Sequence, residues 1–295
     1  MSYEEVRRAS AAIGRGMHEL GLIDSPAQHG YGYSHGRTPS HQHANGWSYE
    51  NDPSTGDNRG EYVQQGGEIV SPIMYDEPET WENLEKICTI VRENGGRASF
   101  ASGAHVNVGT AAFDHKVERH NRLLSLYGQN EDLLYRLSSN PDASQHRPYS
   151  YCQPNTLPST PYNELGGVRN GNYHGVSVSL NNSYGRNNDR AEFRIFDSSL
   201  EPAVLQAQVL MTGSLVNKAL RDEGNPRPNL RRKAVGTNLA ENPRRSALTG
   251  EDWQRSTASV REFIDQYIPG GEGQETRVQQ IIGLFASTRW QAGSR

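Results

Sequence analysis

The residues best suited to chemistry lie on short segments whose alternation of polar and apolar side chains predicts strands. In "GAHVNVG", residues 103–109, the imidazole of His105 and the carboxamide of Asn107 share one face, because side chains two positions apart in a strand point the same way. In "GGEIVSP", residues 66–72, the carboxylate of Glu68 stands on the face opposite Ile69. Each segment therefore combines an apolar back with a polar front.

A third segment, "RAEFRIFD" at residues 190–197, places Arg190, Glu192 and Arg194 on one face and an apolar row on the other. Carboxylate and imidazole groups bind divalent metal ions, and two guanidinium groups at this spacing can bracket a phosphate or a carboxylate. For any single strand the alternative is a solvated face with a local salt bridge, because antiparallel sheets commonly expose one face to water. The three fronts together favour a site for metal and phosphate.

The elements that would position these strands follow from periodicity and turn residues. A capping-box pattern from Ser2 to Glu5 begins the first helix. Pro78 suits the first turn of a second helix, which Gly95 ends. We predict helices over residues 2–20, 78–94, 116–138 with a break near Gly128, and 202–220, amphipathic helical pieces at 260–267 and 276–285, and hairpins within residues 47–72 and 172–197.

Composition limits the classes of protein that the chain can belong to. Its 295 residues can bury a sizeable core, and a 34% hydrophobic fraction with 30 glycines predicts a folded, loop-rich protein. The net charge of -4 argues against a whole-protein affinity for nucleic acid or for an anionic membrane. The sequence has no apolar run of 18 residues, and its two cysteines, Cys88 and Cys152, leave no disulfide framework. We therefore expect a cytoplasmic protein.

Several segments resemble those of a known protein family in their order and separations. The segments are "GGEIVSPI", "TWENLEKICTIVRENGG" followed by "GAHVNVG", and "RAEFRIFDSSLEP". The family that they resemble is the amidoligase family, which consists of carboxylate–amine ligases related to glutamine synthetase and glutamate–cysteine ligase. The resemblance covers roughly residues 45–215. It implies an α+β fold whose antiparallel sheet carries helices on one face and binds ATP and Mg²⁺ on the other, concave face. A substrate carboxylate would take a phosphoryl group there, and an amine would then displace phosphate to give an amide.

The resemblance also implies roles for individual residues. A metal ion and arginines neutralise charge on the transferring phosphoryl oxygens without a proton transfer, which is why the chemistry needs these residue types. The implied assignments are metal binding by Glu68, His105 and Glu192, catalysis by Arg190, Glu192 and Arg194, and nucleotide contact by Asn107, Arg190 and Arg194.

The chain departs from the family pattern at two places. Asn107 stands where the family has the second histidine of a His-x-His strand, and its carboxamide can still hydrogen-bond a phosphate or a metal-bound water. The family's first strand, which carries Glu-x-Glu before the first helix, has no counterpart ahead of the helix cap at Ser2. We therefore expect a sheet without its first strand, through truncation, replacement by another segment or degeneration of the site.

Two parts of the chain are predicted from these observations: an amidoligase-like catalytic domain at residues 1–220, and a basic, proline-containing linker with a C-terminal helical segment at residues 221–295. The expected substrates are a small-molecule or peptide carboxylate and an amine. Two other functions stay open, namely a catalytically inactive binding or scaffold protein, and a nucleic-acid-associated protein that uses the basic arm at 221–245. A histidine-rich loop at residues 29–43 is expected near the mouth of the cleft.

Overall fold

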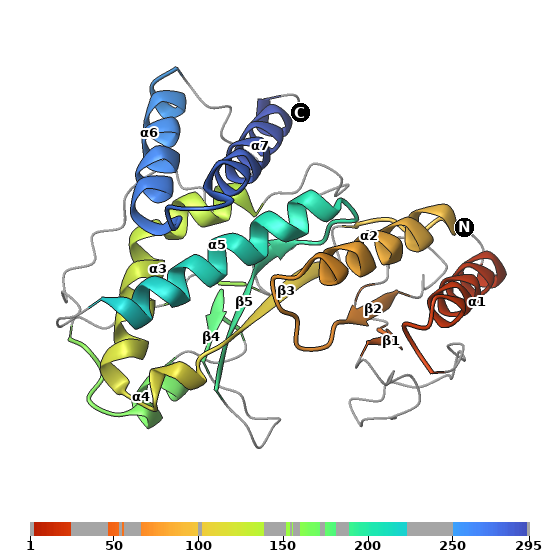
Figure 1. The fold of residues 1–295 in the computed structure, drawn as a ribbon, viewed down its shortest axis with the longest axis horizontal. Coiled ribbons are helices and arrows are strands. Elements are labelled where there is room, and N and C mark those ends of the chain that lie inside the picture. Colours follow the sequence, from red (N-terminus) through yellow and green to blue (C-terminus); the bar gives the residue numbers. More distant parts are fainter. Residues whose placement is uncertain are drawn as a thin grey trace. The chain divides into compact units, whose positions relative to one another are not determined.

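The structure of the protein is a computed structural model, shown in Figure 1. It describes residues 3–24, 47–52, 55, 66–99, 102–138, 152–153, 155, 160–171, 175–180, 189–222 and 250–293. These residues form helices and small antiparallel sheets, which confirms the predicted α+β class. The chain divides into two compact units, of which unit 1 contains residues 1–102, 142–145 and 198–202, and unit 2 contains residues 103–141, 146–197 and 203–295.

The described residues of unit 1 form two helices and a hairpin. Its elements are α1 (Tyr3–Glu19), β1 (Ser48–Asn51), β2 (Gly67–Val70) and α2 (Pro78–Glu93). Proline occupies the first turn of α2, where its missing N–H costs nothing, and Gly95 follows the helix with a φ of 80° that favours glycine. The two helices and the hairpin share a core made of Ile13, Met17, Leu22, Ile23, Trp47, Tyr49, Ile87 and Val91.

The sheet of unit 2 has three antiparallel strands in the order β3-β5-β4. They are β3 (Gly103–Gly109), β4 (Val178–Ser179) and β5 (Arg190–Asp197). The register between β3 and β5 shifts by one residue, because Ala104 pairs with Phe196 whereas Val106 pairs with Phe193. Two residues of β5 therefore lie opposite the single residue His105, which is the arrangement of a β-bulge.

The helices of unit 2 share one core with the apolar back of this sheet (Figure 1). They are a short 3₁₀ helix (Ala111–Phe113), α3 (Val117–Leu137), α4 (Leu165–Gly171), α5 (Pro202–Arg221), α6 (Gly250–Tyr267) and α7 (Gln274–Gly293). Helices α6 and α7 pack on α3 and on each other. Their buried side chains form one core with those of β5, and this core includes Leu123, Tyr127, Phe193, Phe196, Met211, Leu215, Phe263 and Leu284. Burial of this continuous apolar surface is the main favourable term in the stability of unit 2.

Most of the predicted elements are present, while α4 was not predicted and α6 and α7 are longer than expected. Helix α3 runs through Gly128 without the predicted break, because the residues on both sides of that glycine are buried in the core and packing outweighs a weak local propensity. Helices α6 and α7 pack against α3 and share its core, and the division predicted at residues 220 and 221 stays a prediction. The C-terminal helices therefore belong to the same compact unit as strands β3, β4 and β5.

Candidate functional site

Glu192, near the middle of β5, is the centre of a cluster of charged side chains. Its Oε1 atom accepts a hydrogen bond from Nη1 of Arg194 at 2.8 Å and lies 3.5 Å from Nδ1 of His105. Glu192 is 8% exposed and Arg194 is 4% exposed, so the pair is largely removed from water. A charge-assisted hydrogen bond in such surroundings fixes both side chains in place. We call His105, Glu192 and Arg194 the charged cluster.

The strand register places further polar residues beside the charged cluster. Asn107 of β3 and Ser179 of β4 pair with Glu192 from either side, and Arg190 pairs with Gly109 at the end of the ladder. Residues paired in this way share a face of the sheet. Asn107 and Arg190 are exposed, whereas Ser179 is completely buried. The polar front is therefore accessible along β3 and closed along β4.

The β-bulge lies opposite His105, within the charged cluster. His105 lies opposite Arg194 and Ile195, and its imidazole lies 3.5 Å from the Glu192 carboxylate oxygen that Arg194 also contacts. Beyond the bulge, the shifted register turns Phe196 to the apolar back, where it is fully buried. The bulge thus keeps the polar front and the apolar back separate along the whole of β5.

Glu68 lies on β2 in unit 1, whereas the other five predicted site residues lie in unit 2. It is exposed, while its neighbour Ile69 packs against the core of unit 1. Glu50 of β1 is its register partner. The predicted alternation of β2 is therefore confirmed, and the convergence of Glu68 with His105 and Glu192 stays a prediction.

The donor atoms of the charged cluster can be compared with the requirements of Mg²⁺. Among the described residues, the histidine, cysteine, aspartate and glutamate side chains form no group of three or more that could hold a metal ion. His105 and Glu192 offer two donors, and the guanidinium of Arg194 shares one of the carboxylate oxygens. Mg²⁺ is commonly bound by one or two carboxylates together with substrate phosphates and water. These residues therefore fit an ion that arrives with a nucleotide, not an ion held by protein ligands alone.

A second set of polar residues, which the sequence analysis missed, lies next to β4. Oε1 of Glu131, on α3, accepts hydrogen bonds from the backbone N–H of Asn155 at 3.1 Å and from Oγ of Ser177 at 3.3 Å. The single proton of the Ser177 hydroxyl is shared with Oδ1 of Asn155, which lies closer, at 2.7 Å. All three residues are at most 1% exposed. We call Glu131, Asn155 and Ser177 the buried polar network.

The sequence does contain a signal for Glu131. It occupies the position in α3 that follows Leu123 and Tyr127 at intervals of four residues, and these two side chains are completely buried. A carboxylate on the apolar stripe of a helix needs hydrogen-bond partners, because burial of an unsatisfied charge is costly. Burial, and secondly the negative charge of Glu131, raise the pKa of the Tyr127 hydroxyl well above its usual value.

The side chain of Asn155 connects the buried polar network to β4. Its Nδ2 donates to the carbonyl of Val178 at 2.9 Å, and its Oδ1 accepts from the N–H of Val178 at 2.9 Å. One carboxamide therefore satisfies both backbone groups of a strand residue, as a neighbouring strand would. In the same way Asn121 pairs with both backbone groups of Tyr162, at 2.7 and 2.9 Å.

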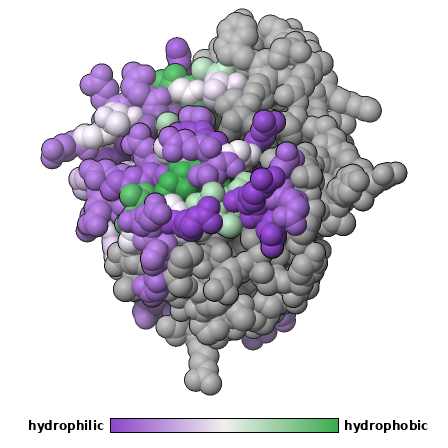
Figure 2. Space-filling view, turned by 90° about the vertical axis from the view of Figure 1, so that its right-hand side faces the viewer, coloured by the Kyte–Doolittle hydropathy of each residue, from purple (hydrophilic) through white to green (hydrophobic). Residues whose placement is uncertain are grey.

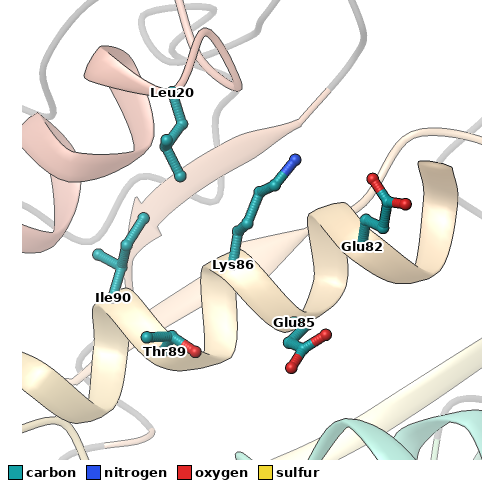
Figure 3. A pocket seen from close by; sticks show the side chains of 6 residues that line it. All are labelled: Leu20, Glu82, Glu85, Lys86, Thr89 and Ile90. Carbon is teal, nitrogen blue, oxygen red and sulfur yellow. The ribbon is translucent and has the colours of Figure 1, made fainter.

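The described surface offers a weaker candidate in unit 1. A pocket of about 370 Å³ lies beside α2 and is lined by Leu20, Glu82, Glu85, Lys86, Thr89 and Ile90. Figure 3 shows that Glu85 and Lys86 point to opposite sides of α2, so the polar groups do not converge on one point. On the face shown in Figure 2, the described residues are mainly hydrophilic, with small apolar areas. The described residues that line the pocket do not bring charged side chains into direct contact as the charged cluster does.

Several predicted features lie outside the described residues. These are the histidine-rich loop at 29–43 and residues 223–245 of the basic arm. Cys88 and Cys152 are both buried and are not joined in a disulfide. Within the described part of the chain, the helices are too short or too polar to cross a membrane.

The chain was compared with protein families, curated proteins and solved structures. No family model, no curated protein and no solved structure matches the chain.

Proposed function

We propose that the protein is an ATP-dependent ligase that joins a carboxylate to an amine through an acyl phosphate, on a glutamine-synthetase-like catalytic fold. The observation that carries this proposal is the charged cluster, in which the buried carboxylate of Glu192 is held by His105 and Arg194 on the polar face of an antiparallel sheet. The order and spacing of the sequence segments that resemble amidoligases supply the reaction class.

Each side chain has a role that follows from its position. The exposed Arg190 would bind phosphate oxygens as they enter, and the buried Arg194, oriented by Glu192, would face them from a fixed position. Asn107, exposed beside Glu192, would donate a hydrogen bond to a phosphate oxygen. Fixed donors of this kind stabilise charge that develops during phosphoryl transfer, because they need little reorganisation when the reaction occurs.

ATP with Mg²⁺ would supply the phosphoryl group that activates the substrate carboxylate. His105 and Glu192 are the residues of unit 2 that would hold the metal ion, and Glu68 of unit 1 would hold a second one. Because the described donors are few, we expect nucleotide and metal to bind together and each to bind poorly alone. The expected substrates remain a small-molecule or peptide carboxylate and an amine.

One observation favours a second candidate, a catalytically inactive binding or scaffold protein. Arg194 already neutralises the Glu192 carboxylate, and an internal ion pair of this kind can serve the fold alone. Such a protein would keep the charged cluster as part of its sheet and would have no affinity for nucleotide.

A thermal-shift titration separates the two candidates. Mg²⁺, ATP and both together are added to the wild-type protein, to Glu192→Gln and to the control Glu275→Gln, which changes an exposed carboxylate in the first turn of α7. A ligand at about 100 times its Kd adds about 2.7 kcal/mol to the free energy of unfolding, which corresponds to a rise of about 5 °C in the melting temperature. We expect this rise only with both ligands, in the wild type and in Glu275→Gln.

The activity itself is measured as ATP consumption with a mixture of amino acids and small amines, and as hydroxamate formation when hydroxylamine replaces the amines. Hydroxylamine traps acyl phosphates, so hydroxamate reports the activated carboxylate directly. Loss of both signals in Glu192→Gln, with both retained in Glu275→Gln, would support the ligase. A wild-type protein without a thermal shift and without hydroxamate would instead support the binding or scaffold protein.

A further inference from the structure

The strand that carries the charged cluster depends on a very short neighbour. Strand β4 contains only Val178 and Ser179, and it pairs with β5 at Phe193 and Glu192. The pairing extends by one further bond, in which the N–H of Arg194 donates to the carbonyl of Ser177 at 2.8 Å. Two-residue strands contribute few ladder bonds, so other contacts must hold β4 in place.

The buried polar network supplies the side-chain part of those contacts, next to a backbone bond from the N–H of Ser177 to the carbonyl of Gln153 at 2.7 Å. Glu131 accepts from the hydroxyl of Ser177 and from the N–H of Asn155, and Asn155 in turn pairs with both backbone groups of Val178. Helix α3 is thereby linked to the two residues of the 177–178 segment. From Ser177 the chain of bonds continues through the backbone of Arg194 to its guanidinium and to the Glu192 carboxylate.

We infer that Glu131 is a positioning residue for the Glu192–Arg194 pair, acting through Ser177 and Asn155. This inference rests on the proposed ligase function, because it assigns Glu131 to the same site. A displacement of about 1 Å in a catalytic group can reduce a rate about a hundredfold. The buried polar network holds the backbone of β5 through β4. Loss of the network would therefore move the guanidinium of Arg194 without removing any group that touches substrate.

Four variants test this assignment. Glu131→Gln keeps a side-chain oxygen that can accept the two hydrogen bonds, whereas Glu131→Ala removes it. Ser177→Ala removes the hydroxyl and keeps the carbonyl that bonds Arg194, so it tests the link if Glu131→Ala fails to fold. Asn121→Ala is the matched control, because it removes a similar buried pairing elsewhere on α3.

The readouts are kcat and KM for ATP, measured through hydroxamate formation, and hydrogen exchange of the backbone amides at residues 191–195. We expect Glu131→Ala to lower kcat about tenfold to a hundredfold with KM for ATP unchanged, and to accelerate exchange in β5. Glu131→Gln should restore most of the rate. Ser177→Ala should show a smaller loss of the same kind, and Asn121→Ala should reduce stability while leaving kcat unchanged.

Other outcomes would overturn the inference. Equal losses of kcat in Glu131→Ala and Asn121→Ala would show that the effect is general destabilisation. Unchanged kcat and unchanged exchange in Glu131→Ala would show that β5 does not depend on the network. A wild-type protein without hydroxamate formation would overturn the proposed function, and the exchange measurement would still show whether Glu131 holds the strand.

Discussion

Replacement of Asn155 by alanine is expected to destabilise unit 2 strongly, although the residue lies outside any helix or strand. The side chain makes three hydrogen bonds, two with the backbone of Val178 at 2.9 Å and one with the hydroxyl of Ser177 at 2.7 Å. Asn155 is 1% exposed and Val178 is completely buried. The Asn155→Ala variant would therefore leave both backbone groups of Val178 without their partner in a site closed to bulk water.

The size of the effect follows from these contacts. A typical hydrogen bond contributes about 1 kcal/mol net, and each buried group that loses its partner adds a desolvation cost of about 1–3 kcal/mol. The hydroxyl of Ser177 keeps its contact with Glu131, and a water molecule in the space left by the carboxamide would recover part of the loss. We therefore expect the free energy of unfolding to fall by about 3 kcal/mol.

Urea denaturation monitored by circular dichroism measures this change, with Asn121→Ala as the comparison and Asn83→Ala as the surface control. Asn121 makes two comparable bonds, so its variant should lose about 2 kcal/mol. Asn83 is half-buried, and its side chain accepts only a long 3.4 Å bond from the exposed Lys86, so its variant should lose no more than about 0.5 kcal/mol. If Asn155→Ala were as stable as Asn83→Ala, the idea that a carboxamide stands in for a strand beside β4 would be refuted.

Three further predictions concern other parts of the fold. Burial lowers the pKa of His120 below its usual 6.5, so as the pH falls the unfolded chain takes up the proton before the folded protein does. Urea titrations should therefore show the free energy of unfolding decreasing below about pH 6.5, and His120→Asn should weaken this dependence. Tyr267→Phe removes the hydroxyl that accepts a 2.9 Å hydrogen bond from Asn130, and calorimetry should show the free energy of unfolding falling by about 1 kcal/mol. An unchanged free energy would show that this bond does not contribute to stability. Ile87→Ala in the core of unit 1 should cost about 2–4 kcal/mol in urea, and Ile73→Ala, at an 85% exposed residue, should cost almost nothing; equal effects would contradict the described core.

The sequence predicted the elements well where periodicity is strong. Helix α2 begins at Pro78 as expected, and strand β3 carries His105 and Asn107 on one face as alternation requires. Such patterns are local, because every third or fourth residue of a helix and every second residue of a strand must meet the same core. The pairing of Glu192 with Arg194 follows from the same rule.

The remaining features depend on contacts between residues far apart in the chain. The β-bulge opposite His105 breaks the period of two, so alternation alone would have turned Phe196 to the polar front. The backbone N–H of Asn155 bonds the carboxylate of Glu131, 24 positions earlier in the chain. Asn155 itself lies in a segment that has no periodic pattern. Only the folded backbone brings such groups together, because the loops between them set the distance and direction of approach.

Unit 1 is completed late in the chain, and this affects the order in which a nascent polypeptide can fold. Leu200 packs against the core built by residues 13–91, and its carbonyl accepts a 2.6 Å hydrogen bond from Arg92. A ribosome must therefore synthesise all of strands β3, β4 and β5 before unit 1 gains its last core contact. Domains generally fold as units during synthesis, from the N-terminus onward. Residues 1–102 of the N-terminal unit can therefore leave the exit tunnel, and meet chaperones and proteases, before the segment at residues 198–202 that completes the unit has been synthesised.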